Sequence, residues 1–257
     1  MASDSAADPL VRPARPPRGK PKAPKAAPAA RAKPSPPAVK RKRDPERTRA
    51  AILAAATLEF SARGYEGTRV GSITRRAKVN KRMLYHYFGG KEGLYLAVLE
   101  GRYADIRTAE AELDLTHREP VEGMRELIHF TWNYFLDHPE FLSILATENQ
   151  HRARFLKQSG RIVQLNSPLI DAIRLVLAKG AAQKIFKPDV DPVQLYISIA
   201  ALGYFYLSNR WTLSTIFRRD LVAETELAAW GEHIVTMILA FLEPKGPAFS
   251  SHASFGK

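Results

Sequence analysis

The chain has 257 residues, 45% of them hydrophobic, with a formal net charge of +13 and no cysteine. This length suits one large domain, or a small domain joined to a larger one. The lack of cysteine excludes disulfides and thiolate chemistry and agrees with a cytoplasmic protein. No hydrophobic run approaches the ~20 residues that cross a bilayer, so neither a membrane partner nor export is expected.

Most of the positive charge lies in residues 1–43, which hold 12 Lys/Arg and two Asp. This segment is rich in Pro, Ala and Lys, so we predict a disordered basic tail. Two interpretations stay open for it: a solubilising spacer, or an arm that contacts DNA phosphates regardless of sequence. The dense charge at 40–43, next to the first helix, favours the arm.

The first helix is predicted over residues 44–64. Asp44 is a good N-cap, Pro45 suits the first helical turn, and Gly64 is a plausible stop. The hydrophobic residues that fall on one face of this helix are Ile52, Ala55, Ala56 and Phe60. Their helical spacing predicts an amphipathic helix packed on a core.

Two short helices are predicted to follow, separated by a tight break at 78–79. Thr68 can cap the second helix and Asn80 the third, which spans 81–87. The inward residues of the second helix would be Val70, Ile73 and Ala77. A longer helix is expected from Lys91 to about residue 112, after a stop at 89–90.

Helical patterns continue to about residue 242, with breaks expected at Pro139, Gly160 and Pro168. No strand-like alternation of useful length is present. We therefore predict an all-α protein with an N-terminal three-helix, helix-turn-helix domain and a larger helical domain. The expected division is a tail over 1–43, the helix-turn-helix domain over 44–92, a larger helical domain over 93–243, and a flexible tail over 244–257.

The third helix carries two kinds of residue. Leu84 and Phe88 lie one turn apart and can pack inward on the first two helices. The opposite side carries cations, a tyrosine and a histidine, as a helix lying in the major groove of DNA requires. The sequence therefore predicts a DNA partner, and the side chains expected to contact DNA are Thr48, Thr68, Lys81, Arg82, Tyr85, His86 and Lys91.

Residues 52–100 resemble the DNA-binding domain of TetR/AcrR-type transcriptional regulators. The shared residues include Gly67-Thr68, Leu84 to Phe88 and Lys91-Glu92. The resemblance implies a homodimeric repressor that binds a near-palindromic operator and is released by a small-molecule effector. It also implies phosphate contacts by Tyr85, Tyr87 and Lys91. Lys78 departs from the family's usual glycine, so a left-handed backbone there would carry strain of roughly 1–2 kcal/mol.

The second domain resembles the subgroup that includes regulators of pyrimidine and nicotinate catabolism. A pocket among its helices should combine aromatic side chains with a few polar ones. Such a pocket suits a planar aromatic or heteroaromatic metabolite. The candidate pocket residues are Trp132, Asn133, Phe135, Asn149, His151, Asn166, Tyr204 and Trp211. The competing interpretation is ordinary core for the aromatic residues and helix caps for Asn149 and Asn166.

The last two long helices, about 192–209 and 224–242, carry hydrophobic stripes that two copies of the chain could share. The candidate interface residues are Leu195, Ile199, Leu202, Ile234, Ile238 and Phe241. Such stripes would bury surface that a monomer exposes. A core within one chain is the competing interpretation.

Two other functional classes were weighed. An architectural nucleoid protein, in which the basic tail dominates, would bind DNA with little sequence preference. Comparing the full chain with a 44–257 truncation on operator and random DNA separates the two classes, because the repressor should keep its selectivity after truncation. An enzyme is disfavoured, because the chain lacks nucleophile-elbow, zinc-binding and Walker motifs. No cofactor or metal is expected.

Overall fold

The computed structural model describes residues 44–244, apart from the side chains of residues 163, 166 and 167. The chain divides into two units, residues 1–42 and 43–257, and the description below concerns the second. The predictions of a basic tail over 1–43 and of a flexible end beyond 244 lie outside the described residues.

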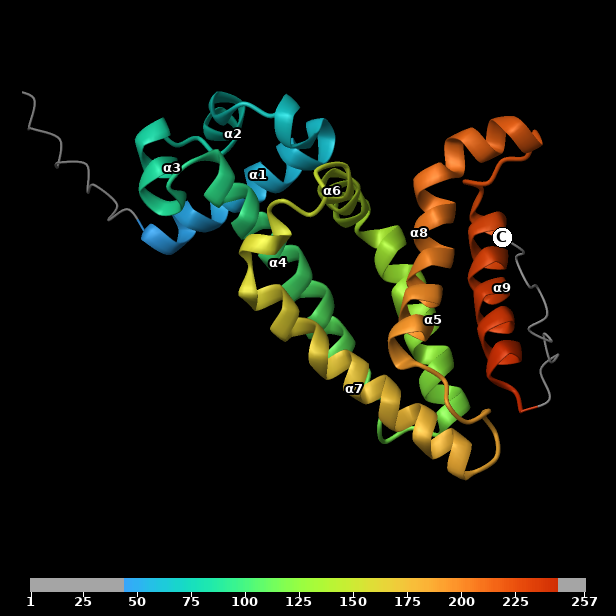
Figure 1. The fold of residues 1–257 in the computed structure, drawn as a ribbon. Helices are drawn as coiled ribbons and strands as arrows, with labels where there is room; N and C mark the ends of the chain where they lie inside the picture. Colours follow the sequence, from blue (N-terminus) through green and yellow to red (C-terminus); the bar gives the residue numbers. More distant parts are fainter. Residues whose placement is uncertain (1–43, 245–257) are drawn as a thin grey trace, which may run out of the picture. The chain divides into compact units, whose positions relative to one another are not determined.

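The described part of the chain is helical and contains no strand, so the predicted fold class is confirmed (Figure 1). A short 3₁₀ turn at Leu156–Gln158 precedes α7. The helices are α1 (Pro45–Gly67), α2 (Val70–Arg76), α3 (Lys81–Phe88), α4 (Lys91–Ala111), α5 (Pro120–Asp137), α6 (Pro139–Gln150), α7 (Gly160–Ala182), α8 (Pro192–Phe217) and α9 (Glu224–Leu242).

Several expected helix boundaries are confirmed and others are wrong. Pro139 and Gly160 begin α6 and α7, as the expected breaks require. Pro168 lies inside α7 rather than at a break. The helix expected to end near Asn209 continues for two more turns to Phe217, because no Pro or Gly interrupts residues 204–217.

The end of α1 differs from the prediction. Gly64 has a left-handed φ of 64° and bends the helix, which then continues to Gly67. Thr68 was expected to cap α2, but it closes α1 instead. Its hydroxyl donates to the carbonyl oxygens of Glu59, at 2.9 Å, and Gly64, at 2.8 Å. The N-cap of α2 is Arg69, which makes no side-chain capping bond.

The N-terminal core is built from the predicted face of α1 together with Ile73 of α2, Leu84 of α3 and the start of α4. This core also includes residues from beyond the helix-turn-helix, because α6 packs against α1. Phe155 is fully buried, with its ring centre 4.5 Å from that of Tyr65 and 4.7 Å from that of Tyr95. The segment that follows α6 is therefore part of the hydrophobic core that supports α1 to α4.

Replacing Phe155 with alanine should lower the free energy of unfolding by about 3–5 kcal/mol, because the lost ring leaves a cavity between two tyrosines. Urea denaturation followed by circular dichroism measures this change. Lys157→Ala, an exposed position in the same segment, is the matched control and should change stability little. Equal stability of the two variants would contradict the assigned packing.

The second core surrounds α5, which packs against α7, α8 and α9. Trp132 of α5 packs against the backbone of two glycines. A Cβ atom added to Gly231 would lie 2.8 Å from the Trp132 ring, and one added to Gly203 would lie 3.5 Å from it. The Tyr206 ring meets Trp132 edge-on at 5.8 Å between ring centres. Trp132 and Phe135 are thus core residues, as the competing interpretation held.

Helices α8 and α9 are hydrophobic on two sides. Of the residues predicted to form an interface, the buried ones are Leu195, Ile199, Ile234 and Ile238. Their side chains pack inside a single chain, so the interface prediction is corrected for these four positions. Leu202 is half-buried, and Phe241 is exposed. The hydrophobic residues exposed on these helices are Val193, Ile197, Phe205, Trp211, Ile216, Phe217, Met237 and Phe241.

Among the described residues, α9 is long and hydrophobic enough to meet the length and composition of a membrane span. The sequence reasoning expected no such segment. One side of α9 packs on α5 through Ile234, Val235 and Ile238. The other side keeps Met237 and Phe241 exposed. The hydrophobicity of α9 therefore reflects one core-facing side and one exposed side.

Candidate nucleic-acid interface

The turn between α2 and α3 fixes the angle at which α3 is presented. Lys78 adopts a left-handed backbone with φ of 54°, so the sequence departs from glycine without reshaping the turn. The backbone at Lys78 therefore carries the expected strain of roughly 1–2 kcal/mol. The amide of Val79 donates to the carbonyl of Thr74 at 3.0 Å, which closes the turn.

Helix α3 has the two faces that the sequence predicts. The Asn80 side chain caps it by accepting from the Met83 amide at 3.0 Å, and Gly89 ends it with a left-handed φ of 71°. Leu84 is fully buried in the N-terminal core, and Phe88 is half-buried beside it. The exposed residues on the other side are Lys81, Arg82, Tyr85 and His86.

The remaining predicted DNA contacts occupy different environments. Lys91 begins α4, and its ammonium lies 4.3 Å from the centre of the Tyr65 ring. Thr48 is half-buried and donates its hydroxyl to the Asp44 carbonyl at 3.0 Å. Tyr87 is half-buried between its neighbouring rings. Thr68 is buried and its hydroxyl is used within α1, so it is unsuited to a phosphate contact.

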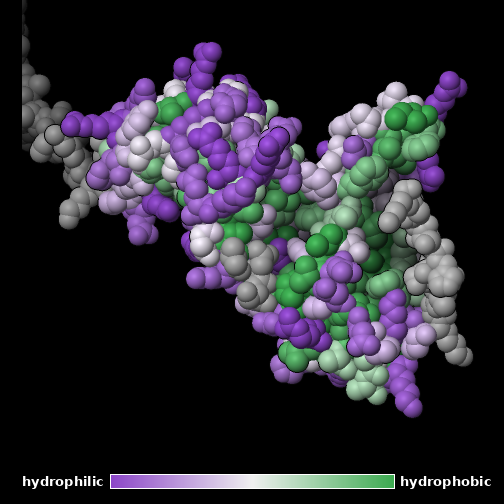
Figure 2. Space-filling model, viewed as in Figure 1, coloured by the Kyte–Doolittle hydropathy of each residue, from purple (hydrophilic) through white to green (hydrophobic). Residues whose placement is uncertain are grey.

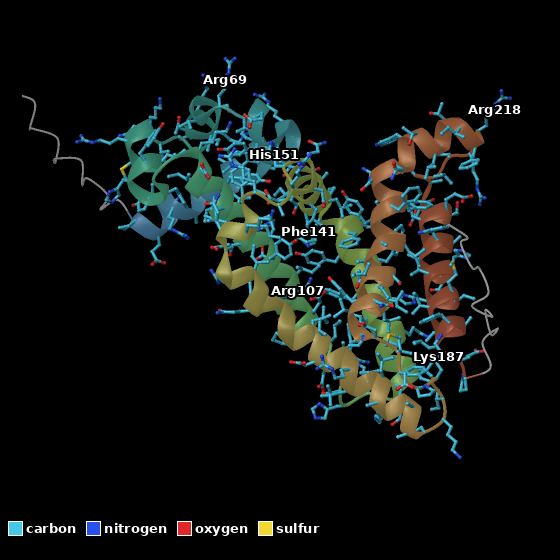
Figure 3. All side chains as sticks on the ribbon, in the orientation of Figure 1. Arg69, Arg107, Phe141, His151, Lys187 and Arg218 are labelled. Carbon is cyan, nitrogen blue, oxygen red and sulfur yellow. The ribbon has the colours of Figure 1, made fainter. Side chains whose placement is uncertain are left out.

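The structure adds basic residues that sequence reasoning left out. Arg69 stands at the start of α2, where Figure 3 shows its side chain pointing away from the helices. Arg47 and Arg75 are also exposed. Hydrophilic side chains cover this part of the molecule, whereas hydrophobic ones gather between α7 and α8 (Figure 2). The signal that could have found Arg69 and Arg75 is the basic run at 69–76.

A buried carboxylate fastens α2 to α1. Glu59 accepts a hydrogen bond from the Arg76 Nε at 2.8 Å, and Arg63 lies 3.6 Å away on the exposed side. The Arg76 hydrogen bond holds the pKa of Glu59 below its ordinary value of 4.5. This ion pair holds the end of α2 against α1.

The Glu59 carboxylate should make stability depend on pH. Because its folded pKa is depressed, its contribution is present above the unfolded pKa and is lost as pH falls through the folded value. Glu59→Gln should therefore lower the free energy of unfolding at about pH 7 by more than at about pH 3. Urea titrations at both values measure the difference, and equal losses would contradict the ion pair.

The residues predicted for an effector pocket do not form one site, although Phe135 and Trp211 share the wall of a hollow of about 200 Å³. Asn133 and Trp211 are exposed, and Tyr204 is half-buried. Asn149 is exposed and donates its amide to the Leu145 carbonyl. His151 bonds the Thr147 carbonyl through Nδ1 and packs on the Tyr65 ring. The side chain of Asn166 lies outside what the structure describes.

Two cavities in the larger helical domain have room for a small ligand. The first, of about 490 Å³, lies between α4 and α7, and Arg107, Leu115 and Leu169 are in its wall. The second, of about 630 Å³, lies between α8 and α9 and includes Phe205 and Trp230. Both volumes fall in the range of small-molecule sites.

A helix-turn-helix with an exposed basic recognition face, joined to a larger helical domain, defines a DNA-binding regulator. Residues 52–98 match the family model described as bacterial regulatory proteins, tetR family. Residues 120–238 match the model of the tetracyclin repressor-like C-terminal domain. The chain belongs to the TetR family of bacterial transcriptional regulators, as the resemblance implied.

Similar proteins cover most of the chain. It is 42% identical over 185 residues to the HTH-type transcriptional repressor NicS of Pseudomonas putida, covering 72% of this chain and 87% of that protein. It is 34% identical over 206 residues to the HTH-type transcriptional regulator RutR of Escherichia coli K12, covering 80% and 95%. These relatives are regulators rather than enzymes, and DNA-binding regulators of this kind work in the cytoplasm.

Solved structures share the fold. A tetR-family regulatory protein from Rhodococcus RHA1 aligns with a TM-score of 0.59 at 16% identity, over 76% of this chain and 97% of that one. The transcriptional regulator FadR of Bacillus subtilis, in complex with stearoyl-CoA, also aligns with a TM-score of 0.59 at 16% identity, over 76% and 99%. At this identity the likeness supports the fold alone.

Proposed function

We propose that this regulator is a repressor that binds a near-palindromic operator as a homodimer and is released from it by a small-molecule effector, without a catalytic step. The observation that carries the proposal is the two-sided α3. Leu84 anchors one side in the core, while Lys81, Arg82, Tyr85 and His86 stand exposed on the other. Arg or Lys reads guanine in the major groove, and hydroxyl groups contact phosphates.

Dimerisation is assigned to the exposed hydrophobic side of α8 and α9. Ile197 and Phe205 are 58% and 60% exposed, Phe241 is 50% exposed, and five more exposed hydrophobic residues lie on the same two helices. Exposed hydrophobic patches of this kind mark contact surfaces. A two-fold axis through this surface would hold two copies of α3 about 35 Å apart, one turn of DNA.

Release of DNA would pass through two connections between the domains. Helix α4 runs from the recognition unit into the effector domain. The segment after α6 also contacts the end of α1 and the start of α4. His151 approaches Glu66 at 3.7 Å, and the Gln158 amide donates to Glu92 at 3.0 Å. An effector that prefers a dimer with a different α3 separation would weaken operator binding by its difference in affinity.

The expected planar heteroaromatic effector loses part of its support, because Trp132 and Phe135 are packed in the core. The effector's chemistry is therefore better inferred from the walls of the cavities than from the distribution of aromatic residues. The site of action would be the chromosome, in the nucleoid.

Operator selection tests the proposal. The full chain would be used to select duplexes from a random pool, and the selected duplexes would be measured by gel shift with and without candidate metabolites. We expect two related half-sites about 10 base pairs apart, centre to centre. Selection of no common sequence would contradict repression at an operator. If no metabolite weakens the shift, effector release fails while operator binding stands.

A further inference from the structure

A charged pair is buried inside the effector domain. Arg107 and Glu110, both on α4, are only 9% and 3% exposed. The Arg107 Nη1 donates to the Glu110 Oε2, and the Arg107 Nη2 donates to the Tyr196 hydroxyl of α8 at 2.7 Å. Arg107 is labelled in Figure 3, in the lower part of α4.

The pair is incompletely satisfied. The Arg107 Nε and the Glu110 Oε1 are buried and have no hydrogen-bond partner among the described residues. Each unpaired buried polar group costs about 1–3 kcal/mol. Hydrophobic residues of similar volume would fill the site at least as stably as this pair. The unpaired donor and acceptor therefore point to a partner that the chain itself does not supply.

A cavity adjoins the pair. Arg107 and Glu110 are both in the wall of the cavity of about 490 Å³ between α4 and α7, and most of the rest of that wall is hydrocarbon, including Leu115, Leu165 and Leu169. Both unpaired atoms are covered, so a ligand in the cavity would reach them only after the two side chains rotate toward it. The second cavity, beside Phe205 and Phe217, opens on the surface assigned above to the partner subunit.

The charges at this wall select against a charged ligand. An organic anion would meet the Glu110 carboxylate and Asp114, and an organic cation would meet the Arg107 guanidinium. Burial raises the pKa of Glu110 to about 7, against the opposing effect of Arg107. A neutral group that offers one acceptor and one donor on adjacent atoms matches the free Nε–H and the free carboxylate oxygen.

We propose that the cavity between α4 and α7 binds a small amide, linear or cyclic, whose carbonyl accepts from the Arg107 Nε and whose N–H donates to the Glu110 Oε1. The hydrocarbon part of the ligand lies against Leu115, Leu165 and Leu169. This inference rests on the proposed function, because the amide would be the effector that the repressor recognises. Arg107 also holds Tyr196, so a ligand at this pair changes the contact between α4 and α8.

Four probes of equal chain length test the assignment: hexanamide, N,N-dimethylhexanamide, hexanoate and hexylamine. Binding to the full chain without DNA would be measured by calorimetry and by ligand-observed NMR, with ε-caprolactam as the cyclic amide. Hexanamide should bind at least about tenfold more tightly than the other three linear probes, since each of those lacks the donor or carries a charge. A preference for hexanoate or hexylamine would overturn the proposal, as would no binding of either amide.

Variants separate the polar pair from the cavity. Glu110→Gln keeps the shape but leaves Arg107 unneutralised, so hexanoate should replace hexanamide as the preferred probe. Ala172→Leu, in the cavity wall, should weaken hexanamide without touching the pair. Arg174→Gln removes an exposed arginine of α7 and should leave both affinities unchanged. Unchanged selectivity in Glu110→Gln would overturn the proposal.

Operator binding of the same preparations shows whether amide binding or repression at an operator fails. Selective operator binding together with failure of the amide tests rejects this inference alone. If the unmodified chain binds no DNA sequence selectively, the proposed function is rejected as well.

Discussion

Replacing Lys81, Arg82 and Tyr85 together, as Lys81→Ala, Arg82→Ala and Tyr85→Phe, should reduce affinity for the selected operator by about 100-fold or more. Each specific base contact contributes about 1–3 kcal/mol of discrimination, and each lost phosphate contact weakens binding to all sequences. The three side chains are exposed and share only a distant contact, with the Lys81 ammonium 5.8 Å from the centre of the Tyr85 ring. Folding should therefore be unaffected.

The control for this variant is a matched loss of charge elsewhere. Arg174→Gln and Lys184→Gln remove two exposed cations from the region of α7 and the turn after it. Gel shifts at several salt concentrations separate the two effects. The α3 variant should lower the slope of log affinity against log salt by about 1–2, and the control should leave both affinity and slope unchanged. Retention of selective binding by the folded α3 variant would remove the basis of the DNA-binding assignment.

The recognition unit could be predicted from sequence because its signals are local. The Asn80 cap, the buried Leu84 and the left-handed Gly89 follow from residues within one or two turns of each other. Thr68 shows where local reasoning fails. A threonine between two helices can cap the second or close the first, and the choice depends on Gly64 and Glu59, which the bend of α1 brings beneath it.

The effector domain was less predictable because its signals are distant in sequence. Trp132 is core because Gly203 and Gly231 make room for its ring, about 70 and 100 residues further along the chain. Arg107 and Glu110 have the spacing of an ordinary surface ion pair on a helix. Only the position of Tyr196 on α8 and the adjoining cavity mark them as buried.

The difference between local and distant signals also explains why most of the predicted interface residues are buried within one chain. Helices that are hydrophobic on all sides are buried on all sides, but the sequence does not say which side meets its own chain and which meets another. Leu195 and Ile199 face the core, whereas Ile197 and Phe205 lie on the side left exposed. Four of the six predicted interface positions are therefore buried within one chain, and an interface on α8 and α9 stays a prediction.

Placing charge on that exposed face should separate the subunits. The double variant Ile197→Glu and Phe205→Glu would bury two carboxylates per chain in a dimer, and each unpaired buried charge costs several kcal/mol. We expect a folded monomer at concentrations where the unmodified chain is a dimer, measured by sedimentation equilibrium together with circular dichroism. Operator affinity should fall by about 100-fold or more, because two linked copies of α3 bind a palindrome far more tightly than one.

Leu175→Glu provides the matched control for that experiment. Leu175 lies on α7 and is 59% exposed, close to the 58% of Ile197, so this variant adds a carboxylate at an equally exposed hydrophobic position on a different helix. This control should remain dimeric and bind the operator normally. If it dissociates as readily as the double variant, the hydrophobic side of α8 is not the specific contact. If the double variant stays dimeric, the subunits meet elsewhere, and the separation of the two α3 helices must be set by another surface.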